Sequence, residues 1–185
     1  MADALQDISI QAVAPDSFEE KLPALTALLH DCVQAGASVN FVMPFPPEEA
    51  QAFWRNKVEA PLKAGRQALW IAQGAGRVLG SVQLDLDTPP NQPHRAEVRK
   101  LLVHPDARRR GVGRALMLIL EDYAAARGRH LLTLDTRAGD AAEPLYQGLG
   151  YRTVGRIPGF SRDPFSDELD ATTIMYKTLA AGAAS

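Results

Sequence analysis

The chain of 185 residues has little cysteine, few aromatic residues and almost no net charge. Its single cysteine, Cys32, excludes an internal disulfide and a metal site built from several cysteines. Twenty basic residues against 22 acidic ones give a formal charge of −2, so no whole-protein field favours nucleic acid or an anionic membrane. No apolar run approaches the ~18–20 residues that span a bilayer. What remains is a globular protein of a reducing compartment.

The composition predicts one cytoplasmic domain. Hydrophobic residues make up 46% of the chain and charged residues 23%, as is usual for globular proteins. The first ten residues include Asp3 and no long apolar segment, so we expect no secretory signal. Because no repeat or linker divides the sequence, we expect a single domain over residues 1–179 and a disordered tail over 180–185. The histidines show no ligand-like spacing and predict no metal site; they are His30, His94, His104 and His130.

The first half of the chain changes from helical to strand periodicity. Helical spacing over residues 18–33 predicts a helix that ends at Gly36, and a second helix is expected over 46–63. Alternation then predicts a hairpin of strands 68–73 and 78–87, the latter half-buried. In the next strand, 96–103, the charged Glu97 and Arg99 alternate in step with the apolar Leu101 and Val103, so all four would lie on one face of the sheet. A β-bulge midway along the strand would place the charged and the apolar residues on different faces.

The second half predicts two helices between strands. A helix over 112–124 fits the helical template without a miss, and a shorter one begins at a capping-box-like pair, Asp140 and Glu143. Strands are expected over 131–135, 152–157 and 171–179. Strand–helix–strand–helix–strand after an antiparallel meander predicts an α/β fold, a mixed and mostly antiparallel sheet flanked by helices.

The stretch from Val103 to Ala115 carries the chemistry. Three arginines, Arg108–Arg110, precede Gly111-Val112-Gly113 at a helix start, where glycine allows close backbone approach and first-turn N–H groups lack intrahelical partners. With the helix dipole and Arg114, these groups predict an anion site large enough for a pyrophosphate. Neither the Rossmann fingerprint nor the P-loop fits the spacing. The alternative is a solvated basic helix start that binds nothing.

Arg108 to Gly113 matches the R/Q-x-x-G-x-G/A signature of the GNAT superfamily of N-acetyltransferases, and the chain resembles that family over nearly its whole length. The motifs GASVNF (36–41), AEVRKLLV (96–103) and LLTLDTRAG (131–139) resemble more narrowly the branch that includes the tabtoxin-resistance acetyltransferases. The resemblance implies a single-domain GNAT-like fold and acetyl-CoA as co-substrate. One departure is Gly139, because many family members carry a cofactor-contacting asparagine there.

The resemblance also implies roles for individual residues. The pyrophosphate would be held by Arg108, Arg109, Arg110, Gly111, Val112, Gly113, Arg114 and Ala115. The strand residues Leu101, Leu102 and Val103 would pair with the pantetheine arm, and an N–H near Val103 would polarise the thioester carbonyl. Tyr146 matches the family's general acid, and Glu97 and Asp135 match carboxylates proposed as the base. The structural alternatives are a core aromatic for Tyr146, a strand-end turn for Asp135 and an ion pair with Arg95 or Arg99 for Glu97.

Three function classes follow. The first is an acetyl-CoA-dependent N-acetyltransferase acting by direct attack in a ternary complex on a small amine, amino-acid-like or toxin-like, with a protein lysine or N-terminus as the other acceptor. The apolar loop 38–47 is expected to cover the acceptor site, as in many relatives. The second is a non-catalytic CoA sensor. The third is a nucleic-acid binder, against which the net charge argues; it would use Arg95, Arg99, Lys100, Arg108–Arg110 and Arg114. We expect no nucleic-acid or membrane partner, and strand edges near the C-terminus leave a homodimer open.

Overall fold

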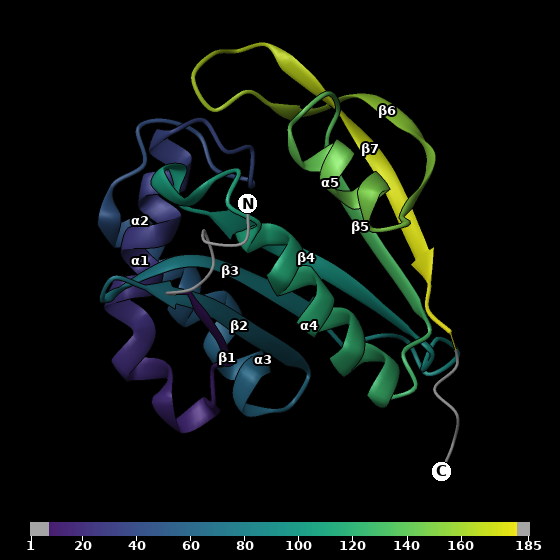
Figure 1. Cartoon of the computed structure of the whole chain (residues 1–185). Helices are drawn as coiled ribbons and strands as arrows, with labels where there is room; N and C mark the ends of the chain where they lie inside the picture. Colours follow the sequence, from purple (N-terminus) through teal and green to yellow (C-terminus); the bar gives the residue numbers. More distant parts are fainter. Residues whose placement is uncertain (1–7, 181–185) are drawn as a thin grey trace.

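The computed structural model describes residues 8–180 and places them in a seven-stranded sheet with helices on both faces (Figure 1). The strands are β1 (Ser9–Ala12), β2 (Gln67–Gly74), β3 (Arg77–Asp85), β4 (Arg95–Val103), β5 (Leu131–Arg137), β6 (Arg152–Arg162) and β7 (Leu169–Thr178). Their order is β1-β2-β3-β4-β5-β7-β6, and only β4 and β5 pair in parallel. This confirms the mixed, mostly antiparallel sheet. Residues 181–185 of the predicted tail lie outside the described residues.

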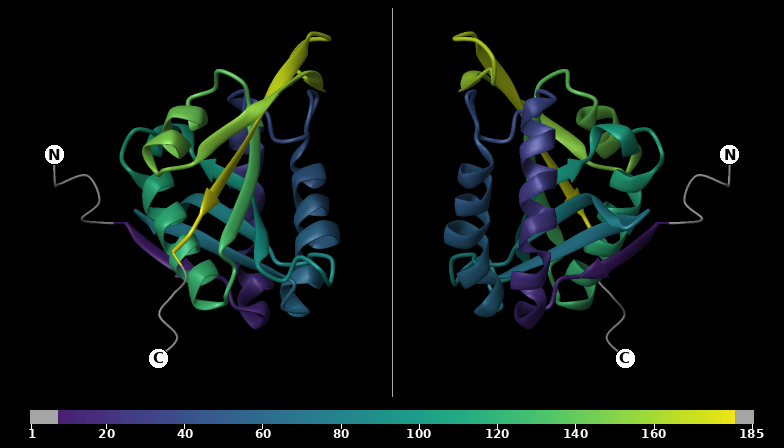
Figure 2. Two further views of the ribbon diagram at one scale, coloured as in Figure 1. Left: turned by 90° about the vertical axis from the view of Figure 1, so that its right-hand side faces the viewer. Right: turned by 90° about the vertical axis from the view of Figure 1, so that its left-hand side faces the viewer.

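Two groups of helices cover the sheet (Figure 2). The helices are α1 (Phe18–Gln34), α2 (Pro47–Phe53), the π-helix η3 (Trp54–Glu59), α3 (Ala60–Lys63), α4 (Val112–Ala126) and α5 (Ala142–Gly148), with 3-10 turns η2 (Pro15–Ser17) and η4 (Pro105–Ala107). The α1 helix continues through Pro23. The predicted helix over 46–63 is confirmed as one run, α2–η3–α3, whose Trp54 indole donates to the Leu25 carbonyl of α1 at 2.9 Å. None of the helices within residues 8–180 is long and apolar enough to cross a membrane.

Each face of the sheet has its own hydrophobic core. The core under α1 and α2 includes Leu69, Ile71 and Leu102, and the core under α4 includes Trp70 and Val82. The strand over 78–87 was expected to be half-buried, and this is wrong. Its polar residues Ser81 and Gln83 are 0% and 2% exposed, because α1 packs on the face where alternation alone predicts solvent.

The predicted bulge lies in β4 opposite β3. Ser81 pairs with Leu102 while Gln83 pairs with Arg99, so β4 has one extra residue, and Lys100 has φ +50°. This confirms the prediction and explains the mixed parity. Before the bulge, Glu97 and Arg99 lie on the face that α1 covers further along the sheet; after it, Leu102 enters the core on that same face.

The predicted start of α5 is wrong in detail. A capping box requires the Asp140 side chain to accept from the Glu143 backbone N–H. Instead, Asp140 Oδ1 accepts from the N–H of Ala141 at 2.6 Å, and Glu143 Oε2 accepts from the N–H of Gly139 at 2.9 Å. The hydrogen bond from Gly139, and after it the Arg156 guanidinium, keeps the pKa of Glu143 below its usual value. The start of α5 is therefore tied to the turn after β5 and to β6.

Candidate active site

The central feature of the site is the place where β4 and β5 separate. The two strands pair only from Arg95–Leu131 to Glu97–Thr133, yet β4 continues to Val103 and β5 to Arg137. Figure 1 shows the two strands diverging from this point. Within residues 8–180, the edge of β4 at Leu101–Val103 that faces β5 has no strand beside it. The Val103 carbonyl accepts from the Arg108 guanidinium at 3.3 Å, and an extended ligand would pair with the remaining backbone groups of this edge.

The loop predicted to bind an anion follows this unpaired edge directly. The backbone takes left-handed conformations at Arg109 (φ +60°) and at Gly111 (φ +83°), the residue that precedes α4. The first helical hydrogen bond runs from the Ala115 N–H to the Gly111 carbonyl, so the N–H groups of Val112 to Arg114 point out of the helix start. Exposed arginines surround this helix start. The chemistry fits a pyrophosphate, and the loop residues are the predicted Arg108–Ala115.

The two glycines of the signature have different structural reasons. Gly111 is needed for its positive φ. Gly113 is buried, and a Cβ there would lie 3.2 Å from Leu145 and 3.5 Å from Val103. The second glycine therefore lets α4 pack closely against β4 and α5, an internal contact that motif spacing does not reveal.

Cys32 and His104 lie near the end of β4. Cys32 Sγ is 3.5 Å from the Val103 carbonyl, and burial raises the pKa of its thiol to about 11, so the thiol stays protonated at neutral pH. His104 follows the end of β4 and is largely buried. Its side chain is only 13% exposed, with Nε2 3.4 Å from Asp31 and Nδ1 accepting from the N–H of Asp106.

Tyr146 lies on the α4 side of the sheet, in the core. It is 6% exposed, and its ring lies 5.7 Å from that of Tyr151, centroid to centroid. Burial raises the pKa of Tyr146 above its usual value, and the negative charges of Asp135 and Asp140 add to the effect. The hydroxyl therefore stays protonated at neutral pH.

The two candidate carboxylates lie on the face opposite Tyr146, and they differ in their partners. The Arg99 guanidinium donates to both Glu97 oxygens, at 3.1 and 3.2 Å, and contacts Asp85 at 2.8 Å. Asp135 is exposed, and its oxygen accepts from the Thr172 hydroxyl at 3.0 Å. The ion pair considered for Glu97 is thus present, with Arg99. Asp135 is the less encumbered of the two carboxylates.

Lys100 joins this face because of the bulge. Its ammonium donates to the Val39 carbonyl and lies 5.3 Å from the Phe41 ring centre and 5.4 Å from that of Phe53. Burial lowers the pKa of Lys100 to about 8, a shift that Asp135 opposes and Arg99 reinforces. We call the sheet face that carries Glu97, Arg99, Lys100, Asp135 and Arg137 the polar face.

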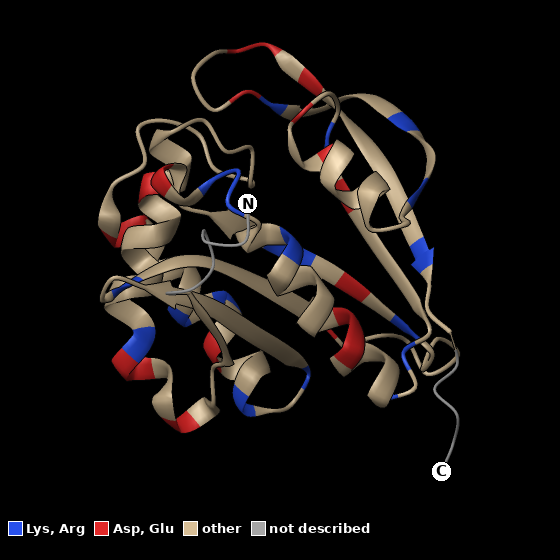
Figure 3. Ribbon diagram, in the orientation of Figure 1, with Lys and Arg blue, Asp and Glu red and all other residues tan. Residues whose placement is uncertain are grey.

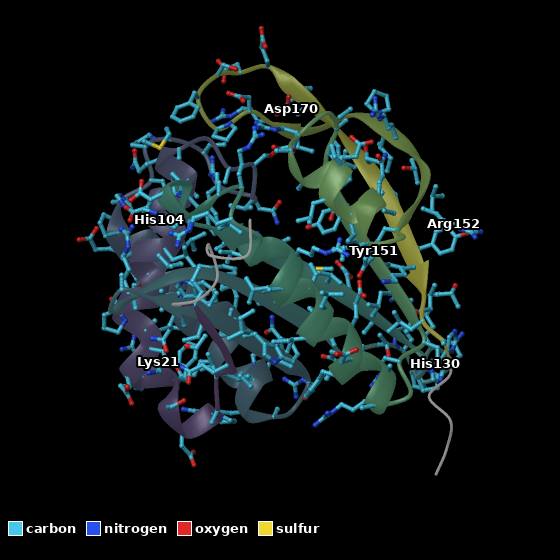
Figure 4. The ribbon with its side chains drawn as sticks, viewed as in Figure 1. Lys21, His104, His130, Tyr151, Arg152 and Asp170 are labelled. Atoms are coloured by element: carbon cyan, nitrogen blue, oxygen red, sulfur yellow. The ribbon has the colours of Figure 1, made fainter. Side chains whose placement is uncertain are left out.

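A loop and a hairpin meet over the polar face. The Met43 N–H donates to the Pro164 carbonyl at 2.8 Å, which joins the loop after α1 to the β6–β7 hairpin. Arg137 donates to the Gly36 carbonyl at 3.3 Å and lies within 3.4–3.5 Å of three carboxylates, those of Asp140, Asp163 and Asp170. Figure 3 shows the acidic residues of this hairpin, and Figure 4 labels Asp170 there. We call these contacts between residues 36–43 and 137–164 the bridge.

Sequence patterns did not identify Thr172 and Arg137 as residues of this site. They also did not place Lys100 on the polar face. The predicted bulge was the available signal for Lys100, which had been considered only as a nucleic-acid contact. The cations considered with it also make internal contacts, because Arg95 donates to Gln92 and Thr133 and Arg99 is paired as above. Thr172 and Arg137 have their partners on β7 and the β6–β7 hairpin, and no local sequence motif indicates these contacts.

Comparison with known proteins gives a consistent result. The family model described as the acetyltransferase (GNAT) family matches residues 26–151. An uncharacterised N-acetyltransferase of Azospirillum brasilense is 30% identical over 62% of this chain and 67% of its own. An L-methionine sulfoximine/L-methionine sulfone acetyltransferase of Pseudomonas paraeruginosa is 28% identical over 77% and 81%. A solved structure from Salmonella typhimurium with its cofactor acetyl-CoA is 20% identical over 97% and 98%, with a TM-score of 0.76.

Proposed function

The chain belongs to the GNAT acetyltransferase family and is an acetyltransferase that uses acetyl-CoA, and we propose that it acetylates the amine of a small, amino-acid-like molecule. The acceptor class is supported by the bridge, which closes over the polar face where Asp135 lies. A closed end accommodates a small molecule better than an extended polypeptide. The relative that acts on L-methionine sulfoximine and its sulfone supports the same class.

The residues present fit the cofactor. The N–H groups at the start of α4 and the flanking arginines would hold the pyrophosphate, and the unpaired edge at Leu101–Val103 would pair with the pantetheine arm. When bound, acetyl-CoA supplies an activated acetyl thioester. Gly139 replaces the asparagine of many family members, and its N–H is already bonded to Glu143, so this contact is absent here.

In the proposed mechanism Asp135 is the base and Tyr146 the acid, and these two residues lie on opposite faces of the sheet. Asp135, on the polar face, would take a proton from the acceptor ammonium, through ordered water, and leave the free amine. Tyr146, on the other face, holds a proton on its hydroxyl at neutral pH and would donate it to the departing thiolate. Glu97, held by Arg99, would contribute charge rather than accept a proton.

Calorimetric titration with acetyl-CoA, with desulfo-CoA and ATP as controls, tests the cofactor site in wild type and Gly111→Trp. We expect binding to wild type and its loss in the variant, because an indole would occupy the loop. Gly65→Trp is the matched control: Gly65 also has a positive φ, +66°, but nothing lies within 4 Å of a Cβ there. Equal loss in both variants would indicate misfolding instead.

A screen of amines with acetyl-CoA then tests the acceptor class. We expect turnover of small α-amino acids, including L-methionine sulfone and sulfoximine, and little turnover of peptides. Preference for peptide lysines or N-termini would overturn the small-molecule proposal. Tight acetyl-CoA binding without turnover of any amine would favour the CoA sensor.

A further inference from the structure

Within residues 8–180, Lys100 forms no ion pair with a carboxylate, in contrast to Arg99 and Arg137 on the same face. Arg99 is paired with Glu97 and Asp85, and Arg137 lies among three aspartates. Arg95, at the start of β4 on this face, also lacks a carboxylate, but its guanidinium donates to the neutral side chains of Gln92 and Thr133. The Lys100 ammonium instead has a carbonyl, that of Val39, and two aromatic ring faces. These contacts hold the cation in place without cancelling its charge.

The ammonium also has hydrogen-bonding capacity left. A lysine ammonium has three N–H donors, and the Val39 carbonyl accepts from one of them. The left-handed backbone at Lys100 and the packing against Phe41 and Phe53 fix where the remaining donors lie. An uncompensated, partly buried cation is costly, so a bound anion would be favoured at this place.

We propose that Lys100 binds the carboxylate of an α-amino-acid acceptor and so selects this class of substrate, an inference that rests on the proposed function. Asp135 lies on the same face of the sheet as Lys100, on the neighbouring strand β5. The polar face therefore offers a cation for the carboxylate of a zwitterion and an anion for its ammonium. The Val39 contact places the cation under the bridge, where the carboxylate end of a small acceptor would lie.

The test compares acceptors that differ only in the carboxylate. For L-methionine sulfone, or the best α-amino acid of the amine screen, kcat and KM are measured for the acid, its primary amide and the amine that lacks the carboxyl group. Rates are expressed per unprotonated amine. We expect Lys100→Met to raise KM for the acid about 10- to 100-fold, as loss of a charge-assisted hydrogen bond would. KM for the amide and the amine should change less than about 3-fold, and Lys100→Arg should restore part of the preference for the acid.

Each outcome has one meaning. If Lys100 only supports the loop through Val39, Lys100→Met will impair acid, amide and amine equally, and the proposal is wrong. If wild type turns over amides or simple amines as well as acids, the proposal also fails while the small-amine function stands. If wild type acetylates no small amine, the proposed function fails, and this inference with it. Lys63→Met, at an exposed lysine of α3, should leave all three acceptors unchanged.

Discussion

A tyrosine hydroxyl can protonate a departing thiolate only if it still carries its proton, and the burial of Tyr146 ensures that it does. The shift of its pKa is upward from the ordinary value of 10, so the protonated form persists at every pH below 10. The same burial agrees with the structural alternative for Tyr146, a core aromatic residue on an amphipathic helix. At this position the packing role and the chemical role do not exclude one another.

Tyr146→Phe tests the acid directly. The variant keeps the ring that packs on Tyr151 and loses only the hydroxyl. We expect kcat to fall about 100-fold or more, the usual contribution of a general acid, while the acetyl-CoA Kd stays within about 2-fold. Steady-state kinetics and calorimetry on the same preparation measure both quantities. Unchanged kcat would remove Tyr146 from the mechanism.

The two carboxylates can be separated in the same way. Glu97 is engaged by two donors of Arg99, whereas Asp135 accepts from the single hydroxyl of Thr172. We therefore expect Asp135→Asn to lower kcat about 100-fold or more and Glu97→Gln to lower it less than about 10-fold. The reverse order, measured with saturating acetyl-CoA, would assign the base to Glu97.

At the scale of elements, the sequence predicted the order of helices and strands well and side-chain burial less well. Helix α4 and the bulge in β4 follow from local patterns, since periodicity and a broken parity lie within a few residues. The burial of Ser81 and Gln83 depends on α1, which is more than 45 residues away in the chain. The bulge was predictable because its signal lies within one strand. The partners of Lys100 were not, because they lie in distant parts of the chain.

Gly80 shows how closely the elements around β4 approach each other. A Cβ there would lie 2.9 Å from the Leu102 carbonyl oxygen, 3.0 Å from Val112 and 3.1 Å from Leu116. The carbonyl belongs to the backbone of β4 and cannot move alone. We expect Gly80→Ala to lower the free energy of unfolding by about 2 kcal/mol, as overpacking in a core does. Urea denaturation at unchanged m-value measures it.

Gly148→Ala provides the control for this effect. Gly148 is the last residue of α5, and nothing lies within 4 Å of a Cβ built there. We expect this substitution to be neutral or to stabilise by less than about 1 kcal/mol, because alanine favours the helix. Equal losses in both variants would mean that close approach at Gly80 is not the cause.

On the scale of the whole molecule, the candidate site depends on two halves of the sheet held at a fixed separation. Strands β1–β4 form one half and β5–β7 the other, and they pair through only three residue pairs between β4 and β5. Contacts outside the β4–β5 pairing must supply the rest of the connection. The bridge does so on the polar face, and the pair Lys177–Glu121 does so on the α4 face.

The Lys177–Glu121 ion pair joins β7 to α4 at 2.6 Å, with the glutamate side chain only 7% exposed. Tyr151, labelled in Figure 4, packs beside it, and its ring lies 5.7 Å from the Lys177 ammonium. Removing one member of such a pair leaves a buried charge uncompensated, so we expect Lys177→Met to lower the free energy of unfolding by about 3 kcal/mol. Arg162→Met is the control: its partner Asp167 is 96% exposed, and the loss should stay below about 1 kcal/mol.

A variant that lacks both Lys177 and Glu121 distinguishes the cost of an unpaired buried charge from the cost of lost packing. If the cost of Lys177→Met comes from the unpaired Glu121 carboxylate, adding Glu121→Leu should recover most of it, since a buried ion pair can often be replaced by apolar side chains. Denaturation midpoints of the four proteins form a double-mutant cycle that isolates this pair. If Lys177→Met alone is as stable as wild type, the pair does not join the halves, and the separation of β4 from β5 is maintained by the bridge and by the packing of α5 on α4.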